Sequence, residues 1–194
     1  MASYRAIPGV LSAVKRLLEN RILVDNEIAD FNPEIVILGN RELADKPTKN
    51  QIGIYLHRVS VDPIGRNRYI SNTDLRQQAQ PELPVNLHLL LIAWTHLGAN
   101  EGLLIGWAMQ HIGSALTLDI SNMSVSDESW MSQEQVQMIP EEMSTENLLR
   151  IWDALPQDYL LSVPYLIKTL RVLPIEPPPS EVLVDRVITP IEAL

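Results

Sequence analysis

The stretch Pro84-Val85-Asn86-Leu87-His88-Leu89-Leu90-Leu91-Ile92-Ala93-Trp94 decides the fold. Every odd-numbered position from Val85 to Ala93 is apolar, which is the period-two pattern of a β-strand. From Leu90 onward the even-numbered positions are apolar as well. A strand that is apolar on both sides is covered on both faces. We therefore expect residues 85–94 to form the central strand of a sheet.

On the N-terminal side of this strand, apolar spacing predicts one helix and two more strands. The helix starts near residue 7, with Pro8 in its first turn. Residues 34–38 form a β-branched run that is typical of a buried strand. In the next strand the apolar parity shifts after Arg58, which predicts a one-residue bulge that keeps both apolar sets facing the core. These apolar positions are Ile7, Val10, Leu11, Val14, Leu17 and Leu18 in the helix, and Ile52, Ile54, Leu56, Val59 and Val61 in the strand.

On the C-terminal side we expect a helix over residues 101–112, a strand over 136–139, a helix capped by Ser144 and a strand over 159–173. Gly102 and Gly106 weaken the first of these helices, so close packing is the expected reason for them. Pro164 inside the last strand predicts an edge position or a bulge. Together these elements predict an α/β (α+β) domain over residues 1–173, a small mixed sheet with helices packed on it.

Residues 174–194 differ in character from this domain. Pro174 and the run Pro177–Pro179 predict an extended, semi-rigid connector. The following segment has β-propensity at Val182, Val184, Val187 and Ile188 but no local partner. Such an arm is free to pair with its own sheet edge or with another chain, and we favour β-augmentation of another chain.

Charge is unevenly distributed along the 194 residues, which carry a net charge of −9. Residues 1–76 hold eleven Lys and Arg against nine Asp and Glu, whereas residues 77–194 hold four against fifteen. An acidic surface repels phosphate groups, so no nucleic-acid partner is expected. The asymmetry suits a subunit whose basic half meets the acidic half of a neighbour. No apolar run approaches the length of a membrane span, and we expect no membrane insertion.

The sequence offers little catalytic chemistry. It contains no cysteine, no Gly-x-Ser-x-Gly motif and no phosphate-binding glycine motif. Its four histidines lack the helical spacing of metal ligands, so packed or surface roles are expected. The pairs Asp127-Glu128 and Glu141-Glu142 fit a solvated acidic surface better than a catalytic pair. We therefore predict no enzyme, no metal and no cofactor.

One group of residues indicates an interface. Arg58 and the polar segment that follows it are rich in Arg and Tyr, which are favoured at interface hot spots. A solubilising loop is the alternative interpretation. With the arm, the predicted interface residues are Arg58, Arg66, Asn67, Arg68, Tyr69, Val182, Val184, Val187 and Ile188.

Three ordered segments resemble the cap, or tail-terminator, family of extracellular contractile injection systems, typified by the antifeeding prophage and the Photorhabdus virulence cassettes. They are Leu56-His57-Arg58-Val59 with Arg66-Asn67-Arg68, the stretch over residues 84–94, and residues 151–165 from Ile151-Trp152-Asp153 to Val163-Pro164-Tyr165. The beginning, Tyr4-Arg5-Ala6-Ile7, is also similar to that of the family. His57 stands where the family would have Tyr.

The resemblance implies a phage tail-terminator-like fold and a structural role. It implies a ring of six copies at the end of the particle distal to the baseplate, which ends growth of the inner tube and ties the last sheath ring to it. It also implies inner tube and sheath proteins as partners, and assembly in the cytoplasm on a particle that is released or anchored. The alternative is a small monomeric adaptor that binds peptide partners through its Pro-rich arm.

Overall fold

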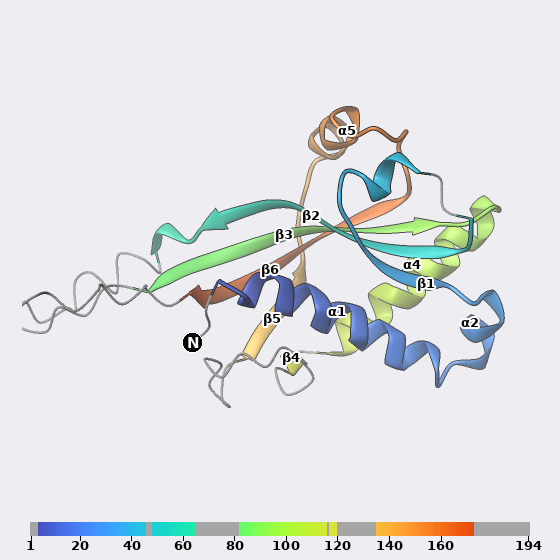
Figure 1. Ribbon diagram of the computed structural model, residues 1–194, viewed down its shortest axis with the longest axis horizontal. Coiled ribbons are helices and arrows are strands. Elements are labelled where there is room, and N and C mark those ends of the chain that lie inside the picture. The colour runs from blue at the N-terminus through green and yellow to red at the C-terminus, as the bar shows by residue number, and fades with distance from the viewer. Residues whose placement is uncertain (1–3, 46–47, 65–81, 116, 120–134, 173–194) are drawn as a thin grey trace, which may run out of the picture.

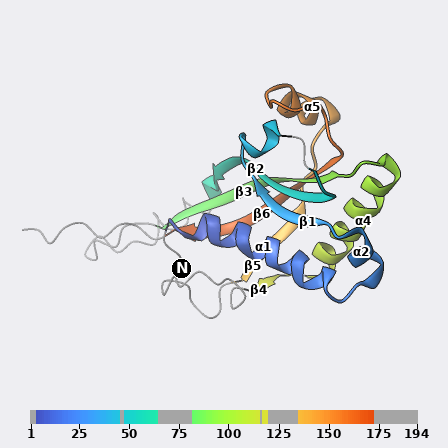
Figure 2. The same ribbon diagram turned by 45° about the vertical axis from the view of Figure 1, so that its right-hand side comes forward.

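The computed structural model describes residues 4–45, 48–64, 82–115, 117–119 and 135–172. Six strands form one sheet in the order β1-β2-β3-β6-β5-β4. β1 pairs with β2 in parallel, and every other neighbouring pair is antiparallel. Helices pack on this mixed sheet (Figures 1 and 2), which confirms the predicted α/β class.

The strand β3 (Leu83–Trp94) is central, as predicted. It lies between β2 (Gln51–Val61) and β6 (Ser162–Val172). All side chains from Leu87 to Ala93 are buried, so both of its faces are covered along this stretch. The reason is its composition, because a strand that is apolar on both sides is stable only inside a layered core.

One face of the sheet is covered by α1 (Ala6–Ile22) and α4 (Gly98–Ser114). The apolar stripe of α1 and one side of α4 join the odd-numbered residues of β3 in the main core. The short helix α2 (Asn26–Phe31) follows α1, and its capping residue Asp25 accepts a hydrogen bond from Trp107 Nε1 of α4 at 3.0 Å. α1 and α4 were predicted and α2 was not, and the reason given for two glycines of α4 was wrong. Apart from the adjoining backbone of α4 itself, a methyl group added at Gly102 or Gly106 would meet no atom of the described residues within 4 Å, so close packing among them does not explain these glycines.

The other face carries α5 (Thr145–Asp153) and the short 3-10 helix η1 (Glu42–Ala44). Leu43 and Trp152 from these elements pack on Leu90 and Ile92 of β3 in a second, smaller core. The Ser144 hydroxyl accepts a hydrogen bond from Asn147 N, which confirms the predicted cap. Trp152 Nε1 donates to Ser162 Oγ at 3.0 Å, which ties α5 to the start of β6.

The remaining strands depart from expectation in local ways. β1 (Glu34–Leu38) lies at the edge of the sheet and buries only Ile35, so its description as a buried strand was wrong. β5 (Gln135–Pro140) and β4 (Leu118–Asp119) are the last two strands toward the opposite edge of the sheet. β6 is an interior strand, yet Pro164 lies where β5 ends and its carbonyl accepts from Glu141 N at 2.9 Å. The missing N–H of Pro164 therefore falls at the end of the ladder, where it interrupts little.

The predicted bulge in β2 is present. The pairing register with β3 shifts between Leu56 and Arg58, which leaves His57 as the extra residue. Val59 and Val61 consequently lie opposite Leu87 and Val85, on the side of the sheet that carries α1 and α4. Their predicted burial is wrong, because Val59 is 46% and Val61 is 42% exposed.

Candidate functional site

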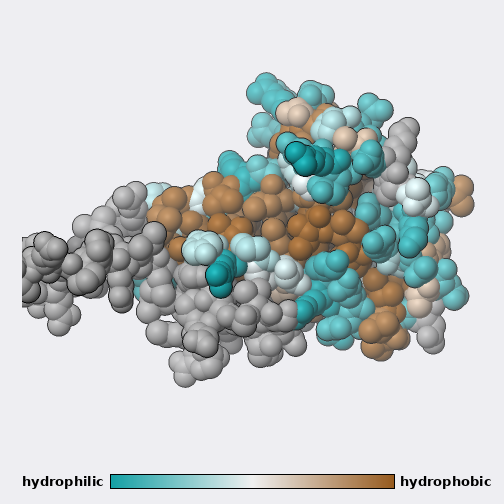
Figure 3. Space-filling model, viewed as in Figure 1, coloured by the Kyte–Doolittle hydropathy of each residue, from teal (hydrophilic) through white to brown (hydrophobic). Residues whose placement is uncertain are grey.

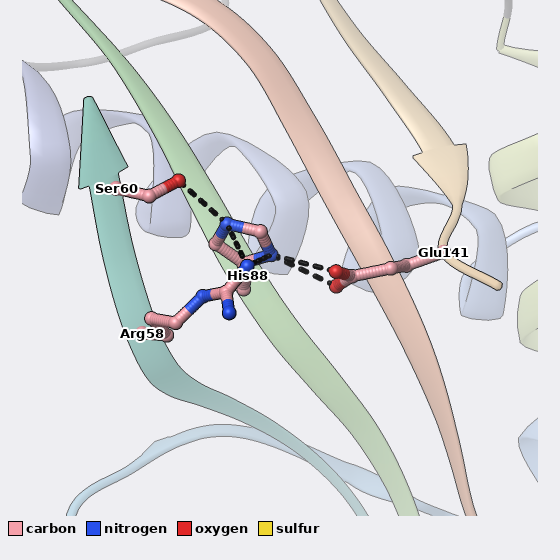
Figure 4. A network of polar contacts seen from close by, with 4 residues as sticks. All are labelled: Arg58, Ser60, His88 and Glu141. Atoms are coloured by element: carbon pink, nitrogen blue, oxygen red, sulfur yellow. Dashed lines mark hydrogen bonds and ion pairs between the residues drawn. The ribbon is translucent and has the colours of Figure 1, made fainter. Parts of the chain in front are cut away.

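A cluster of four polar side chains joins three parts of the sheet on the α5 side. Arg58 and Ser60 come from β2, His88 from β3, and Glu141 from the residue that follows β5 (Figure 4). The bulge at His57 makes this meeting possible. Residues alternate between faces along a strand, and the extra residue moves Arg58 onto the face opposite that of Ile54 and Leu56, where it pairs with His88.

The imidazole of His88 is the centre of this cluster and is 4% exposed. Its Nδ1 lies 2.8 Å from Glu141 Oε1 and 3.0 Å from Oε2. Its Nε2 lies 2.8 Å from Ser60 Oγ and 3.1 Å from Arg58 Nη2. A guanidinium is only a donor and a carboxylate only an acceptor. We therefore assign the tautomer in which His88 Nδ1–H donates to Glu141 while Nε2 accepts from Arg58 and Ser60.

Glu141 is held in place by its backbone as well as its side chain. Its N–H donates to the Pro164 carbonyl at 2.9 Å, which directs the carboxylate over β6 toward His88. The side chain is 17% exposed. The expectation that Glu141 belongs to a solvated acidic surface is thus wrong, whereas its neighbour Glu142 is exposed.

His57 adds a second imidazole beside the cluster. Its ring centre lies 6.0 Å from that of His88, edge to face. Burial lowers the pKa of His57; Glu141 acts in the opposite direction, while His88 and Arg58 reinforce the lowering. Its Nε2 is buried and has no hydrogen-bond partner among the described residues. Adding a proton to this ring would therefore introduce charge where it is poorly solvated.

His88 lies between the Ser60 hydroxyl and the Glu141 carboxylate and contacts both, as the histidine of a serine hydrolase triad does. Such a triad needs N–H donors directed at the oxyanion that forms beside the serine. Asp62 N donates to Pro84 O, and by the alternation of antiparallel bonds Ser60 N–H is also directed to β3. Val61 N–H points to the outer side of β2. Neither of these two amides faces the Ser60 hydroxyl, and Arg58 shares the nitrogen that would act as base.

Of the predicted interface residues, the structure places only Arg58. It lies in the cluster, with an exposed side chain. Arg66, Asn67, Arg68, Tyr69, Val182, Val184, Val187 and Ile188 lie outside the described residues. The meeting of Ser60, His88 and Glu141 was not anticipated. The one signal for it was His88 itself, a polar residue inside the most apolar strand of the chain.

Two wider searches cover the described part of the chain. Within it, no group of three or more His, Asp or Glu side chains is arranged to hold a metal ion. None of the helices described there is both long enough and apolar enough to span a membrane.

Comparison with known protein families decides the classification. The family model described as the Pvc16 N-terminal domain matches residues 9–186. The chain belongs to this family. The resemblance to the cap proteins of contractile injection systems is confirmed by this match, which continues beyond β6 into the predicted arm.

A solved structure has a similar fold. The sheath/tube terminator of the extracellular contractile injection system PVC, in its extended state, superposes with a TM-score of 0.58 at 14% sequence identity. The alignment covers 97% of this chain and 64% of that terminator, so the chain spans less than two thirds of its length. No relative was found among curated proteins.

Proposed function

We propose that this chain is a sheath/tube terminator, a structural subunit of a phage-tail-like contractile injection system. The observation that carries the proposal is the family match over residues 9–186. The shared fold with the PVC sheath/tube terminator supports it, because that protein has the corresponding role in its own particle. A role in assembly also agrees with a polar cluster that fixes side chains of β2, β3 and Glu141 relative to one another.

In the proposed assembly, six copies form a ring at the end of the particle distal to the baseplate. The ring ends growth of the inner tube and joins the last tube ring to the last sheath ring. Contacts within such a ring are head-to-tail and use two different surfaces of each copy. The uneven charge of the sequence supports this arrangement, since a basic N-terminal part and an acidic C-terminal part attract each other across copies.

Arg58 and the segment Arg66-Asn67-Arg68-Tyr69 are the proposed docking surface for tube, sheath or a sister copy. The cluster supplies a physical reason for its position. The Arg58 side chain contacts His88, which Glu141 in turn holds in place. β2 ends at Val61, shortly before Arg66. The docking residues would thus follow a strand that is anchored on its β3 side. We further propose that residues 1–173 act as the body and residues 174–194 as an arm that contacts other subunits.

Particle length is the direct test. Cells that produce the particle but lack this gene should make tubes or sheaths of irregular length, and the wild-type gene should restore uniform length. A variant with alanine at residues 66–69 should fold normally yet fail to restore it. The matched control is Arg150→Ala on α5, where the arginine pairs with Glu146 on the surface and is 72% exposed. If particles made without the gene had uniform length and the protein were strictly monomeric by native mass spectrometry, the terminator hypothesis would be wrong and the adaptor hypothesis would be favoured.

A further inference from the structure

The α5 side of the sheet is covered along only part of its length. Figure 1 shows β2, β3 and β6 continuing well beyond α5, and Figure 3 shows hydrophilic side chains over α5 beside an apolar band that follows the strands. The smaller core under α5 contains Leu90 and Ile92 of β3 but no residue of the row that crosses β3 at His88. Among the described residues, no helix covers this row.

The uncovered row crosses four strands. Arg58 of β2 pairs with His88 of β3, His88 pairs with Leu166 of β6, and Leu166 pairs with Ile139 of β5. Side chains that lie directly opposite each other on antiparallel strands share one face of the sheet. Ile139 is 36% exposed and Leu166 is half-buried, so an apolar surface lies beside the polar cluster.

A second cation lies on the far side of this apolar surface. Lys168 is exposed and lies two residues beyond Leu166 on β6, so its side chain projects from the same face. β6 lies two strands away from β2, and the strand spacing and the rise per residue place Lys168 roughly 12 Å from Arg58. We call this surface the basic face, and it consists of Arg58, Leu166, Ile139 and Lys168.

The chain does not neutralise these two cations in its described part. Three carboxylates near this face already have partners, namely Glu141 with His88, Glu82 with Arg171 and Asp62 with the amide of Ile64. The side chains of Glu141 and Glu82 are each only 17% exposed. Neither Arg58 nor Lys168 forms an ion pair with a described residue. The exposed charges of the basic face are therefore positive.

The Arg58 side chain is held in place before a partner arrives. Its Nη2 lies 3.1 Å from His88 Nε2, and Glu141 fixes the imidazole from the other side. Its remaining N–H groups have no acceptor among the described residues. A carboxylate can accept from two N–H groups of a guanidinium at once. A side chain that is already restrained loses less conformational entropy on binding.

We propose that the basic face binds an acidic segment of a partner chain, with one carboxylate on Arg58, another on Lys168 and an apolar side chain over Leu166 and Ile139. The apolar surface between the cations favours a protein over a nucleic acid, and a chain with a net charge of −9 repels phosphate. The inference deepens the proposed function, because it assigns a chemistry to the docking surface at Arg58. It rests on that function for the partner being another subunit of the particle.

Carbodiimide coupling in the purified particle tests this contact. The reagent joins a lysine amine directly to a carboxylate that lies against it. We expect mass spectrometry to find Lys168 joined to an Asp or Glu of another chain in the particle, and to find no such link in the isolated full-length protein at low concentration. Lys15 is the internal control, because it lies 3.6 Å from Glu19 of its own chain and should couple to it in both samples.

Charge reversal distinguishes a specific contact from chance coupling. Arg58→Glu should lower the yield of the Lys168 link several-fold, because it repels the acidic segment. The matched control Arg150→Glu reverses an exposed arginine on α5 and should leave the yield unchanged. Because Arg58 also contacts His88, circular dichroism checks that the variant folds. Ile139→Ser removes the apolar contact at an exposed position and should lower the yield independently of the cluster.

Three results would overturn the proposal. They are a Lys168 link only within its own chain, an unmodified Lys168 while Lys15 couples, and a yield that neither Arg58→Glu nor Ile139→Ser lowers. Binding of a labelled DNA duplex that Lys168→Glu abolishes would also overturn it, by assigning the face to phosphate.

The particle-length assay separates this inference from the proposed function. If Lys168 were linked to another chain but loss of the gene left particle length uniform, the basic face would stand and the terminator role would be wrong. If length became irregular and the link were absent, only the basic face would be wrong.

Discussion

The two halves of β2 lie in different surroundings. Residues 51–55 run between β1 and β3, and Ile52 and Ile54 are at most 1% exposed in the main core. Residues 56–61 pair with β3 alone among the described residues, carry Arg58 and Ser60 of the polar cluster, and expose Val59 and Val61. The difference teaches that one strand can belong to the core along its first half and lie at the surface along its second. Substitutions on either side of the bulge should therefore have different consequences.

The largest expected contrast is between an aspartate in each half. Ile54→Asp should prevent folding, because an unpaired charge at a buried position costs about 4 kcal/mol or more, against a typical total stability of about 5–15 kcal/mol. Val61→Asp should change the unfolding free energy by only about 0.5 kcal/mol, since its side chain is already in contact with solvent. Circular dichroism during thermal unfolding measures both. Cooperative unfolding of Ile54→Asp at the wild-type temperature would contradict the division of the strand.

A smaller contrast concerns the cluster that anchors the second half. Glu141→Ala should lower the unfolding free energy by about 1–3 kcal/mol, because it leaves the buried His88 Nδ1–H without its acceptor. Glu142→Ala is the matched control and should stay within about 0.5 kcal/mol of wild type, since this side chain is exposed. Urea denaturation gives both values. Equal effects of the two substitutions would mean that the cluster contributes nothing measurable.

The smallest expected effect is a pH dependence that originates at the bulge. Burial lowers the pKa of His57 in the folded chain, so below about pH 6.5 the unfolded chain takes up a proton more readily than the folded one. The stability contributed by this difference is present above that pH and is lost as the pH falls toward the folded pKa. His57→Gln should therefore lose less stability than wild type on acidification, when unfolding free energies are compared by urea denaturation across this range.

The exposed His96 provides the control for this experiment. His96→Gln should follow the wild-type pH dependence closely, because its imidazole does not belong to the cluster. If His57→Gln and His96→Gln gave the same profile as wild type, the acid sensitivity of the fold would have to come from other groups.

Local sequence patterns predicted most helices and strands, but they predicted the burial of the side chains only in part. The α1 stripe, the alternation in β2 and the double-sided apolar pattern of β3 each depend on residues close in sequence, and all three elements are present. Burial was less predictable. Val59 and Val61 lie on the predicted face but extend beyond the cover of the helices, and Ile35 alone is buried in β1. How far a helix reaches across a sheet depends on packing, which periodicity does not contain.

The sequence by itself determined the α/β class, the central strand, the bulge and the family, because each follows from side-chain spacing or from ordered motifs along the chain. Only the tertiary structure decided the polar cluster and the open edge. Ser60 and Glu141 stand 28 and 53 residues from His88, and they meet because strand order and register bring β2, β3 and β5 across one sheet. The edge at Val59–Val61 exists because β1 stops pairing at Tyr55. Both are properties of how strands of unequal length align, which no short stretch of sequence specifies.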